Sequence, residues 1–213
     1  MNSKPAGTSI ETLSDLEYAA GQLARVEPRF AEALEITGPL PLRRRQDGFT
    51  ALLDMIVSQQ VSVAAADAIW NRLESAGLVA EAALRQCSDE ELRNCGLSRQ
   101  KSRYARALAQ AKLDYASLRD LDDSELVAQL TKILGIGVWT AEIYGMSALG
   151  RPDMIAAGDL ALQESARILF ELENRPKECE LRKLAKPWSP WRSVAANILW
   201  AYYRAIKQRE GIR

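Results

Sequence analysis

The chain has 213 residues, of which 28 are Lys or Arg and 28 are Asp or Glu, so its formal net charge is zero. Its apolar content of 47% supports a folded core and excludes a disordered or collagen-like chain. The absence of histidine excludes Ser-His and Cys-His nucleophile pairs and a histidine-ligated zinc ion. Three cysteines are too few to supply all four thiolate ligands of an iron–sulfur cluster, and we expect them to be reduced and buried.

The first residues are polar and contain no apolar core of a signal peptide. No apolar run reaches the roughly 18 residues that a membrane-spanning helix needs. We therefore expect an intracellular protein without a membrane partner, located in the cytoplasm or nucleoid if the source is bacterial.

Apolar residues recur at three- and four-residue spacing along the chain, which predicts an all-α fold of about ten short helices. Helical periodicity starts at Leu13, and residues 39–45 form a Pro-rich crossover segment. Ser62, Ser88 and Ser124 are predicted helix starts. The predicted helical ranges after the crossover are 49–57, 63–73, 79–86, 88–95, 99–112, 123–133, 138–149, 159–173, 178–184 and 190–208.

Gly135 and Gly137 lie in a turn between two predicted helices. Glycine tolerates positive φ and lets another backbone approach closely. The amides of Val138, Trp139 and Thr140 then belong to the first turn of a helix, at the positive end of its dipole. The turn is either a cradle for a phosphate group or simply a tight corner between helices, and the residues alone leave both interpretations open.

Asp159 follows a glycine and precedes an amphipathic helix, which is the usual place of an N-cap residue. Backbone N–H groups at a helix N-terminus favour the anionic carboxylate. Such an anion can also stabilise the cation that develops when a glycosidic bond breaks.

The C-terminal stretch 186–204 holds three of the five tryptophans. Tryptophans at helical spacing usually pack in a core. The alternative is a stacking wall for a planar ligand such as a flipped nucleobase.

In combination, five motifs resemble those of the helix-hairpin-helix base-excision DNA glycosylases. Within that superfamily, the chain resembles the 3-methyladenine DNA glycosylase II branch. The resemblance spans residues 50–205. The motifs are Ile56-Val-Ser-Gln-Gln-Val-Ser62, Cys95-Gly-Leu-Ser-Arg-Gln-Lys101, Leu134-Gly-Ile-Gly-Val-Trp-Thr-Ala141, Gly158-Asp-Leu-Ala-Leu162 and Trp191-Arg-Ser-Val-Ala195.

This resemblance implies an enzyme that flips alkylated purines out of damaged double-stranded DNA and excises them by hydrolysis. Asp159 would be the catalytic carboxylate. The turn would bind the DNA backbone, and Gln60 would be the wedge that fills the space of the flipped nucleotide. The residues implied at the backbone are Gly135, Gly137, Val138 and Thr140.

The resemblance also implies a base pocket formed by Trp139 and Trp200, with Tyr144 as a further candidate. No cofactor is required, although the backbone carbonyls of Thr131, Ile133 and Ile136 would hold a monovalent cation. Trp139 occupies the position of the Schiff-base lysine in bifunctional relatives, so we expect no lyase step. Where relatives have an intercalating Leu and a Pro before the hairpin glycines, this chain has Gln60 and Leu134.

We expect a monomer with two lobes and a substrate cleft between them. One lobe would comprise residues 1–45 and 148–213, with the catalytic Asp and the C-terminal aromatics. The other would comprise residues 46–147, a helical bundle that ends in the hairpin. The alternatives are a glycosylase for oxidised or mismatched bases, and a helix-hairpin-helix DNA-binding protein in which Asp159 is only an N-cap.

Overall fold

The computed structural model of the protein describes residues 8–207, and within this range it contains twelve α-helices, two 3-10 turns and no strand. The all-α prediction is confirmed. None of the helices in this range is both long and apolar enough to cross a membrane. The chain forms two compact units: unit 1 contains the described residues up to Arg44 and from Gly145 onward, and unit 2 is Arg45–Tyr144.

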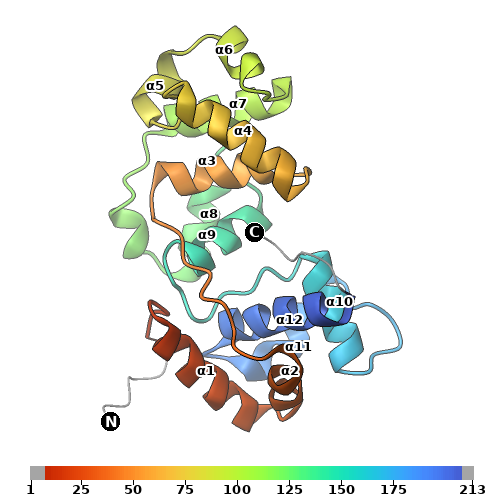
Figure 1. Ribbon diagram of the computed structural model, residues 1–213. Coiled ribbons are helices and arrows are strands. Elements are labelled where there is room, and N and C mark those ends of the chain that lie inside the picture. The colour runs from red at the N-terminus through yellow and green to blue at the C-terminus, as the bar shows by residue number, and fades with distance from the viewer. Residues whose placement is uncertain (1–7, 208–213) are drawn as a thin grey trace. The chain divides into compact units, whose positions relative to one another are not determined.

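Unit 1 is built around its C-terminal helix, which packs against three other helices of the unit (Figure 1). Within its core, Phe30 and Phe170 lie against Trp188, at ring-centroid distances of 5.1 and 5.4 Å. The central helix is α12 (Arg192–Lys207), and its neighbours are α1 (Leu13–Val26), α2 (Arg29–Thr37) and α10 (Leu160–Leu169). The unit also contains α11 (Glu178–Leu184) and the 3-10 turn Lys186–Trp188.

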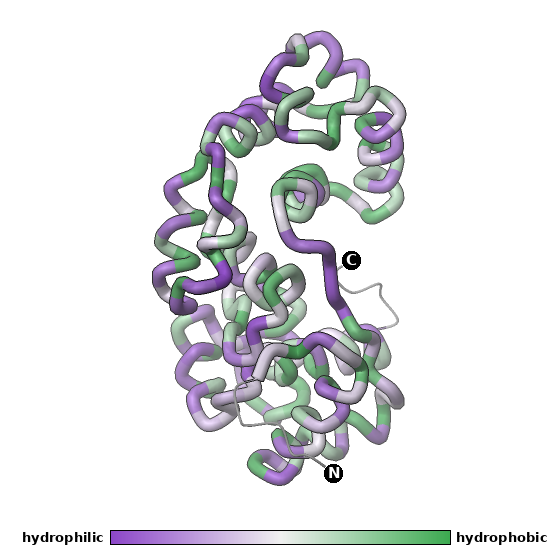
Figure 2. The backbone as a smooth tube through the Cα atoms, turned by 90° about the vertical axis from the view of Figure 1, so that its left-hand side faces the viewer, coloured by the Kyte–Doolittle hydropathy of each residue, from purple (hydrophilic) through white to green (hydrophobic). Residues whose placement is uncertain are grey.

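Unit 2 begins at Arg45, within the hydrophilic stretch of residues 43–47 that precedes its first helix (Figure 2). The apolar faces of its helices meet around α7, which packs against α3, α5 and α6. The helices are α3 (Phe49–Ser58), α4 (Val63–Ser75), α5 (Glu81–Gln86), α6 (Asp89–Asn94), α7 (Arg99–Ala111), α8 (Asp123–Leu130) and α9 (Val138–Ser147), with a 3-10 turn at Ser117–Arg119. The last residues of α9 belong to unit 1.

The predicted helix starts are mostly confirmed. Ser62 and Ser88 cap α4 and α6 with their side chains. Ser124 is wrong as the start of α8, because Asp122 provides the cap and accepts the Glu125 amide proton at 2.8 Å. The expectation that the cysteines are buried holds for two of them, but Cys179 is exposed on α11.

Unit 2 contains two helical hairpins with similar turns. The first hairpin consists of α6, residues 95–98 and α7, and the second consists of α8, residues 131–137 and α9. Each turn has a glycine with φ of +94°, Gly96 in the first and Gly135 in the second. A buried apolar residue follows each of them, Leu97 and Ile136, and anchors the turn to the core.

Candidate active site

Asp159 is the N-cap of α10 and is buried, with only 7% of its surface exposed. Its Oδ1 accepts hydrogen bonds from the amides of Ala161 and Leu162, at 2.9 and 3.0 Å. The predicted capping geometry is therefore confirmed. These two bonds fix the orientation of the carboxylate relative to the helix, which a group that must face a reaction centre requires.

The loop that precedes Asp159 is fastened to the start of α12. The Ser193 hydroxyl accepts the Met154 amide proton at 3.1 Å and lies 2.7 Å from the Arg151 carbonyl oxygen. Arg192 donates to both carboxylate oxygens of Asp153 at 2.8 Å. Burial would raise the pKa of Asp153, but the hydrogen bonds from Arg192 and Ser189, together with the charge of Arg192, outweigh burial and lower that pKa. The loop is thus held in place by a set of contacts within unit 1.

In the second hairpin only one of the two glycines has positive φ. Gly135 has φ of +94°, whereas the φ of Gly137 is not positive. A Cβ atom added at Gly135 would lie 2.2 Å from Cγ of Tyr104, whereas one added at Gly137 would meet no atom within 4 Å. Gly135 is therefore required by the fold, and Gly137 leaves open space in front of α9.

The remaining predicted backbone-binding residues differ in exposure. Val138 is exposed at the start of α9, whereas the side chain of Thr140 is buried and accepts a hydrogen bond from Gln59 at 3.4 Å. Thr140 can therefore offer its backbone amide, but its side chain is already engaged inside unit 2.

The predicted wedge Gln60 is exposed at the end of α3 and has a left-handed backbone, with φ of +56°. Its neighbour Gln59 reaches the second hairpin, where Nε2 donates to the Gly135 carbonyl at 3.0 Å. Lys101 of the first hairpin donates to the Val57 carbonyl at 2.6 Å. The loop that carries Gln60 is thus connected to both hairpins. The sequence did not predict these contacts of Gln59 and Lys101.

A surface pocket of about 550 Å³ lies where these three segments meet. It is lined by Gln59 and Gln60, by Ser98 and Lys101 of the first hairpin, and by the turn of the second hairpin. Burial lowers the pKa of Lys101. The pocket brings the predicted wedge and the predicted phosphate cradle together on one face of unit 2.

The three predicted pocket aromatics have different surroundings. Trp139 is half-buried on α9 in unit 2. Tyr144 is completely buried in the same unit, donates its hydroxyl proton to Asp47 and accepts the Gly48 amide proton at 3.4 Å. Burial, followed by the bond to Asp47, raises the pKa of Tyr144. Its contribution to a base pocket stays a prediction.

Trp200 lies in unit 1 and is 4% exposed. The guanidinium carbon of Arg43 lies 5.7 Å from the centroid of its ring. Its buried indole N–H has no hydrogen-bond acceptor among the described residues. No pattern in the sequence connects Arg43 to a ring more than 150 positions away.

The predicted cation site consists of backbone carbonyls in the turn of the second hairpin. The Ile133 carbonyl accepts the Ile136 amide proton at 3.0 Å, which closes the turn locally. In residues 8–207, no group of three or more acidic, thiol or imidazole side chains could hold a metal ion. The cation site at the carbonyl oxygens of Thr131, Ile133 and Ile136 stays a prediction.

The chain is similar to known proteins over most of its length. The protein mag2 of Schizosaccharomyces pombe, described as alkylbase DNA glycosidase-like, is 29% identical over 209 residues, covering 88% of this chain and 93% of the relative. The structure of 3-methyladenine DNA glycosylase Mag1 of the same yeast with abasic DNA has a TM-score of 0.76 and 27% identity, covering 92% of this chain and 99% of that one.

A DNA-3-methyladenine glycosidase from Bacillus halodurans has a TM-score of 0.79 and 31% identity, covering 90% of this chain and 92% of that one. The family model described as HhH-GPD superfamily base excision DNA repair protein matches residues 53–190, a range that contains both hairpins and Asp159. The chain belongs to the HhH-GPD superfamily of base excision DNA repair proteins.

Proposed function

We propose that the protein is a monofunctional DNA glycosylase that flips alkylated purines out of duplex DNA and excises them by hydrolysis, leaving an abasic site. The observation that carries the proposal is Asp159, a buried carboxylate fixed by two backbone amides in a chain without histidine. Relatives described as 3-methyladenine DNA glycosylases, one of them solved with abasic DNA, support the substrate class.

The chemistry of the substrate explains why one carboxylate suffices. Alkylation at N3 or N7 gives the purine a positive charge, so the base departs with the electron pair of the glycosidic bond and needs no proton from a general acid. The deoxyribose is left with a developing positive charge at C1′. Asp159 stabilises this charge and orients the water molecule that adds to C1′ and releases a proton to the solvent.

The second hairpin holds the DNA in this scheme. The backbone amides at the start of α9 bind a phosphate group, with the positive end of the helix dipole behind them. Gly137 leaves the space for the phosphate, because no side chain occupies it. Gln60 enters the DNA double helix at the position that the flipped nucleotide has left. Trp139 and Trp200 provide the aromatic surfaces for the flipped base.

A monovalent cation bound by the carbonyls of Thr131, Ile133 and Ile136 is part of the proposal. Neutral oxygen ligands suit a singly charged ion better than Mg²⁺, which favours carboxylates and phosphates. When bound, the ion adds positive charge next to the phosphate site. Replacing K⁺ and Na⁺ by tetramethylammonium at equal ionic strength tests this, since a cation-dependent hairpin binds DNA less tightly in the organic salt.

The principal test replaces Asp159 by Asn, which keeps a capping oxygen and removes the charge. We expect excision of 3-methyladenine to fall by at least about a hundredfold in single-turnover experiments, with folding and DNA binding retained. The matched control is Asp122→Asn at the cap of α8, where the same change affects a helix start that the mechanism does not use.

Three results would separate the alternatives. Near-normal excision by Asp159→Asn would leave Asp159 as a cap only. Chromatography of the bases released from alkylated and from oxidised duplexes distinguishes the two glycosylase classes. A wild-type protein that binds duplex DNA and releases no base would favour the DNA-binding alternative.

A further inference from the structure

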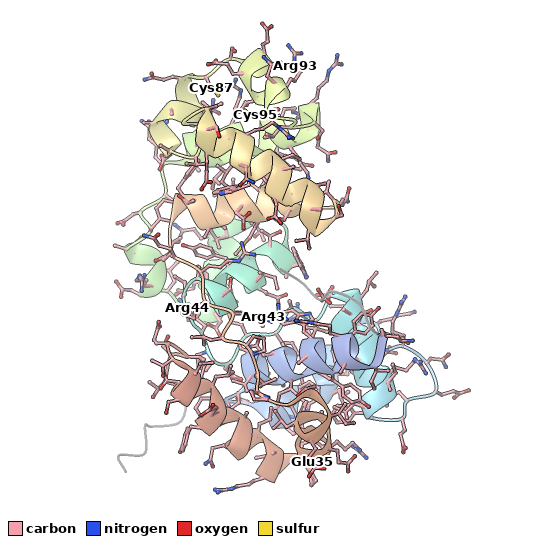
Figure 3. The ribbon with its side chains drawn as sticks, viewed as in Figure 1. Glu35, Arg43, Arg44, Cys87, Arg93 and Cys95 are labelled. Atoms are coloured by element: carbon pink, nitrogen blue, oxygen red, sulfur yellow. The ribbon has the colours of Figure 1, made fainter. Side chains whose placement is uncertain are left out.

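Helix α12 crosses unit 1 with the side chains of the neighbouring helices around it (Figure 3). Ser193, Asn197 and Trp200 are spaced at i, i+4 and i+7 along this helix, so they share one face. The Ser193 hydroxyl bonds to the carbonyl oxygens of Arg151 and Met154, at 2.7 and 2.8 Å. Those two residues belong to the loop that leads into α10. The face that carries Asn197 and Trp200 thus begins against the loop of the predicted catalytic carboxylate.

Asn197 has a side-chain oxygen that the fold leaves unsatisfied. Its Oδ1 is buried, and no hydrogen bond within residues 8–207 reaches it, although the residue as a whole is only partly buried. One turn later, the buried indole N–H of Trp200 also has no acceptor in this range. Buried polar groups normally have partners. Two unsatisfied groups on one face of α12 therefore indicate a place where a ligand or an ordered water molecule supplies the hydrogen bonds.

The two side chains are close enough to act on one ligand. Side chains in an α-helix lean toward its N-terminus, so the ring of Trp200 leans toward the turn that carries Asn197. Residues three positions apart on a helix have Cβ atoms about 5 to 6 Å from each other. A planar base that stacks on the face of the ring presents its edge to groups beside the ring. The amide of Asn197 is such a group.

An asparagine amide matches the edge of adenine that carries N6 and N7. It accepts a hydrogen bond from the N6 amino group and donates one to N7. Methylation of adenine at N3 leaves both atoms unchanged. Methylation of guanine at N7 removes that acceptor, and guanine has the acceptor O6 where adenine has its amino donor. With 7-methylguanine, Asn197 can make at most one of the two bonds, and its Oδ1 stays unsatisfied.

We infer that Asn197 is a specificity-determining residue, which reads N6 and N7 of the flipped base and favours 3-methyladenine over 7-methylguanine. This inference rests on the proposed function and on Trp200 as a stacking surface. Both lesions carry a positive charge, so the charge alone does not separate them. A site that forms hydrogen bonds with one substrate rejects another that leaves its polar groups unpaired.

The test replaces Asn197 by Leu, which removes both hydrogen-bonding groups and nearly keeps the volume. Duplex DNA treated with dimethyl sulfate contains both lesions, and chromatography measures the two released bases in one reaction, after subtraction of the release without enzyme. Competition between the lesions gives the ratio of their kcat/KM values. We expect the ratio of 3-methyladenine to 7-methylguanine to fall by about 5- to 150-fold, the range for a bidentate contact between an amide and a base. The change should come from slower release of 3-methyladenine.

Two measurements separate this role from packing. Asn197→Leu removes a buried oxygen that has no partner in the described range, so the melting temperature should stay the same or rise. Asn71→Leu makes the same exchange at an exposed position of α4 and should leave the ratio unchanged. If Asn197→Leu does not fold, Asn197→Ala removes the same two groups.

An unchanged ratio would overturn the inference, as would an equal loss of both rates or a selective loss of 7-methylguanine release. The inference would also fail if the wild-type protein released only 7-methylguanine. A wild-type protein that releases neither base contradicts the proposed function instead. A wild-type protein that releases both bases, with a ratio that does not respond to Asn197, contradicts only the inference.

Discussion

The two hairpins of unit 2 have the same turn geometry and different helix starts. In both, a glycine at φ +94° is followed by a buried apolar residue. In the first hairpin the next residue is Ser98, whose hydroxyl accepts the Lys101 amide proton at 3.3 Å and caps α7. In the second hairpin that position is Gly137, which has no side chain with which to cap α9.

This difference indicates which helix start is suited to an external ligand. A helix N-terminus leaves backbone N–H groups without partners in the helix, and a serine cap satisfies one of them. In the first hairpin the serine cap satisfies one of these N–H groups, whereas the second hairpin has open space at Gly137. A common turn thus serves packing in one hairpin and, as we propose, phosphate binding in the other.

The largest effect is expected from alanine at the two turn glycines. Gly135→Ala adds positive-φ strain and places Cβ against the Tyr104 ring, so the free energy of unfolding should fall by about 3 kcal/mol or more. Gly96→Ala adds the same strain but meets the far end of a long side chain, at 2.5 Å from Nη2 of Arg72, and should lower the free energy of unfolding by about 1 to 2 kcal/mol. Urea denaturation measures both, and equal losses would contradict the assignment of Tyr104.

The sequence predicted most of the fold because its helices have clear ends. Apolar periodicity located nearly all of them, and Ser62 and Ser88 follow the standard capping pattern. The end of α8 was overestimated, since residues 131–133 belong to the turn that leads to Gly135. Periodicity does not detect such an ending, because Ile133 is buried in the turn as it would be in a helix.

The site was only partly predictable. Asp159 as an N-cap follows from local sequence, because a cap is made within three residues. Gln59, Lys101 and Arg43 make contacts with residues between 44 and 157 positions away, and a single sequence does not contain that information. The first hairpin could have been found, since Cys95-Gly-Leu-Ser repeats the order of Leu134-Gly-Ile-Gly.

A smaller effect is expected at the helix start itself. Gly137→Val places a side chain in the open space, so affinity should fall about tenfold or more for damaged and undamaged duplexes alike, because phosphate contacts carry no sequence information. Gly137→Ser gives α9 the cap of α7 and should weaken DNA binding while leaving stability unchanged or raised by a few tenths of a kcal/mol, about the Gly-to-Ser difference at a cap.

Fluorescence anisotropy at a fixed salt concentration measures the affinity for DNA. Urea denaturation measures the stability. Ser98→Gly is the reverse change in the first hairpin and should leave DNA affinity unaltered. Loss of affinity for the damaged duplex alone would assign Gly137 to lesion recognition.

The smallest effect is expected from borohydride trapping, where we predict no protein–DNA adduct. Trp139 of the second hairpin carries no amine, and Lys132 is exposed in the turn that follows α8. The amine that deserves the test is Lys101, beside the pocket in the first hairpin. Burial lowers its pKa, so a larger fraction of it is neutral at a given pH than of an ordinary lysine, and that fraction grows as pH rises.

Its hydrogen bond to the Val57 carbonyl holds this amine in place, so water should remain the nucleophile and the strand should stay intact. Trapping is run on a damaged duplex at pH 7 and pH 9, with Lys101→Met as the attribution control. An adduct that increases with pH and disappears in Lys101→Met would move the nucleophile to the first hairpin. The hairpin that we regard as packing would then take part in the chemistry, and the hydrolytic mechanism would be replaced by a lyase mechanism.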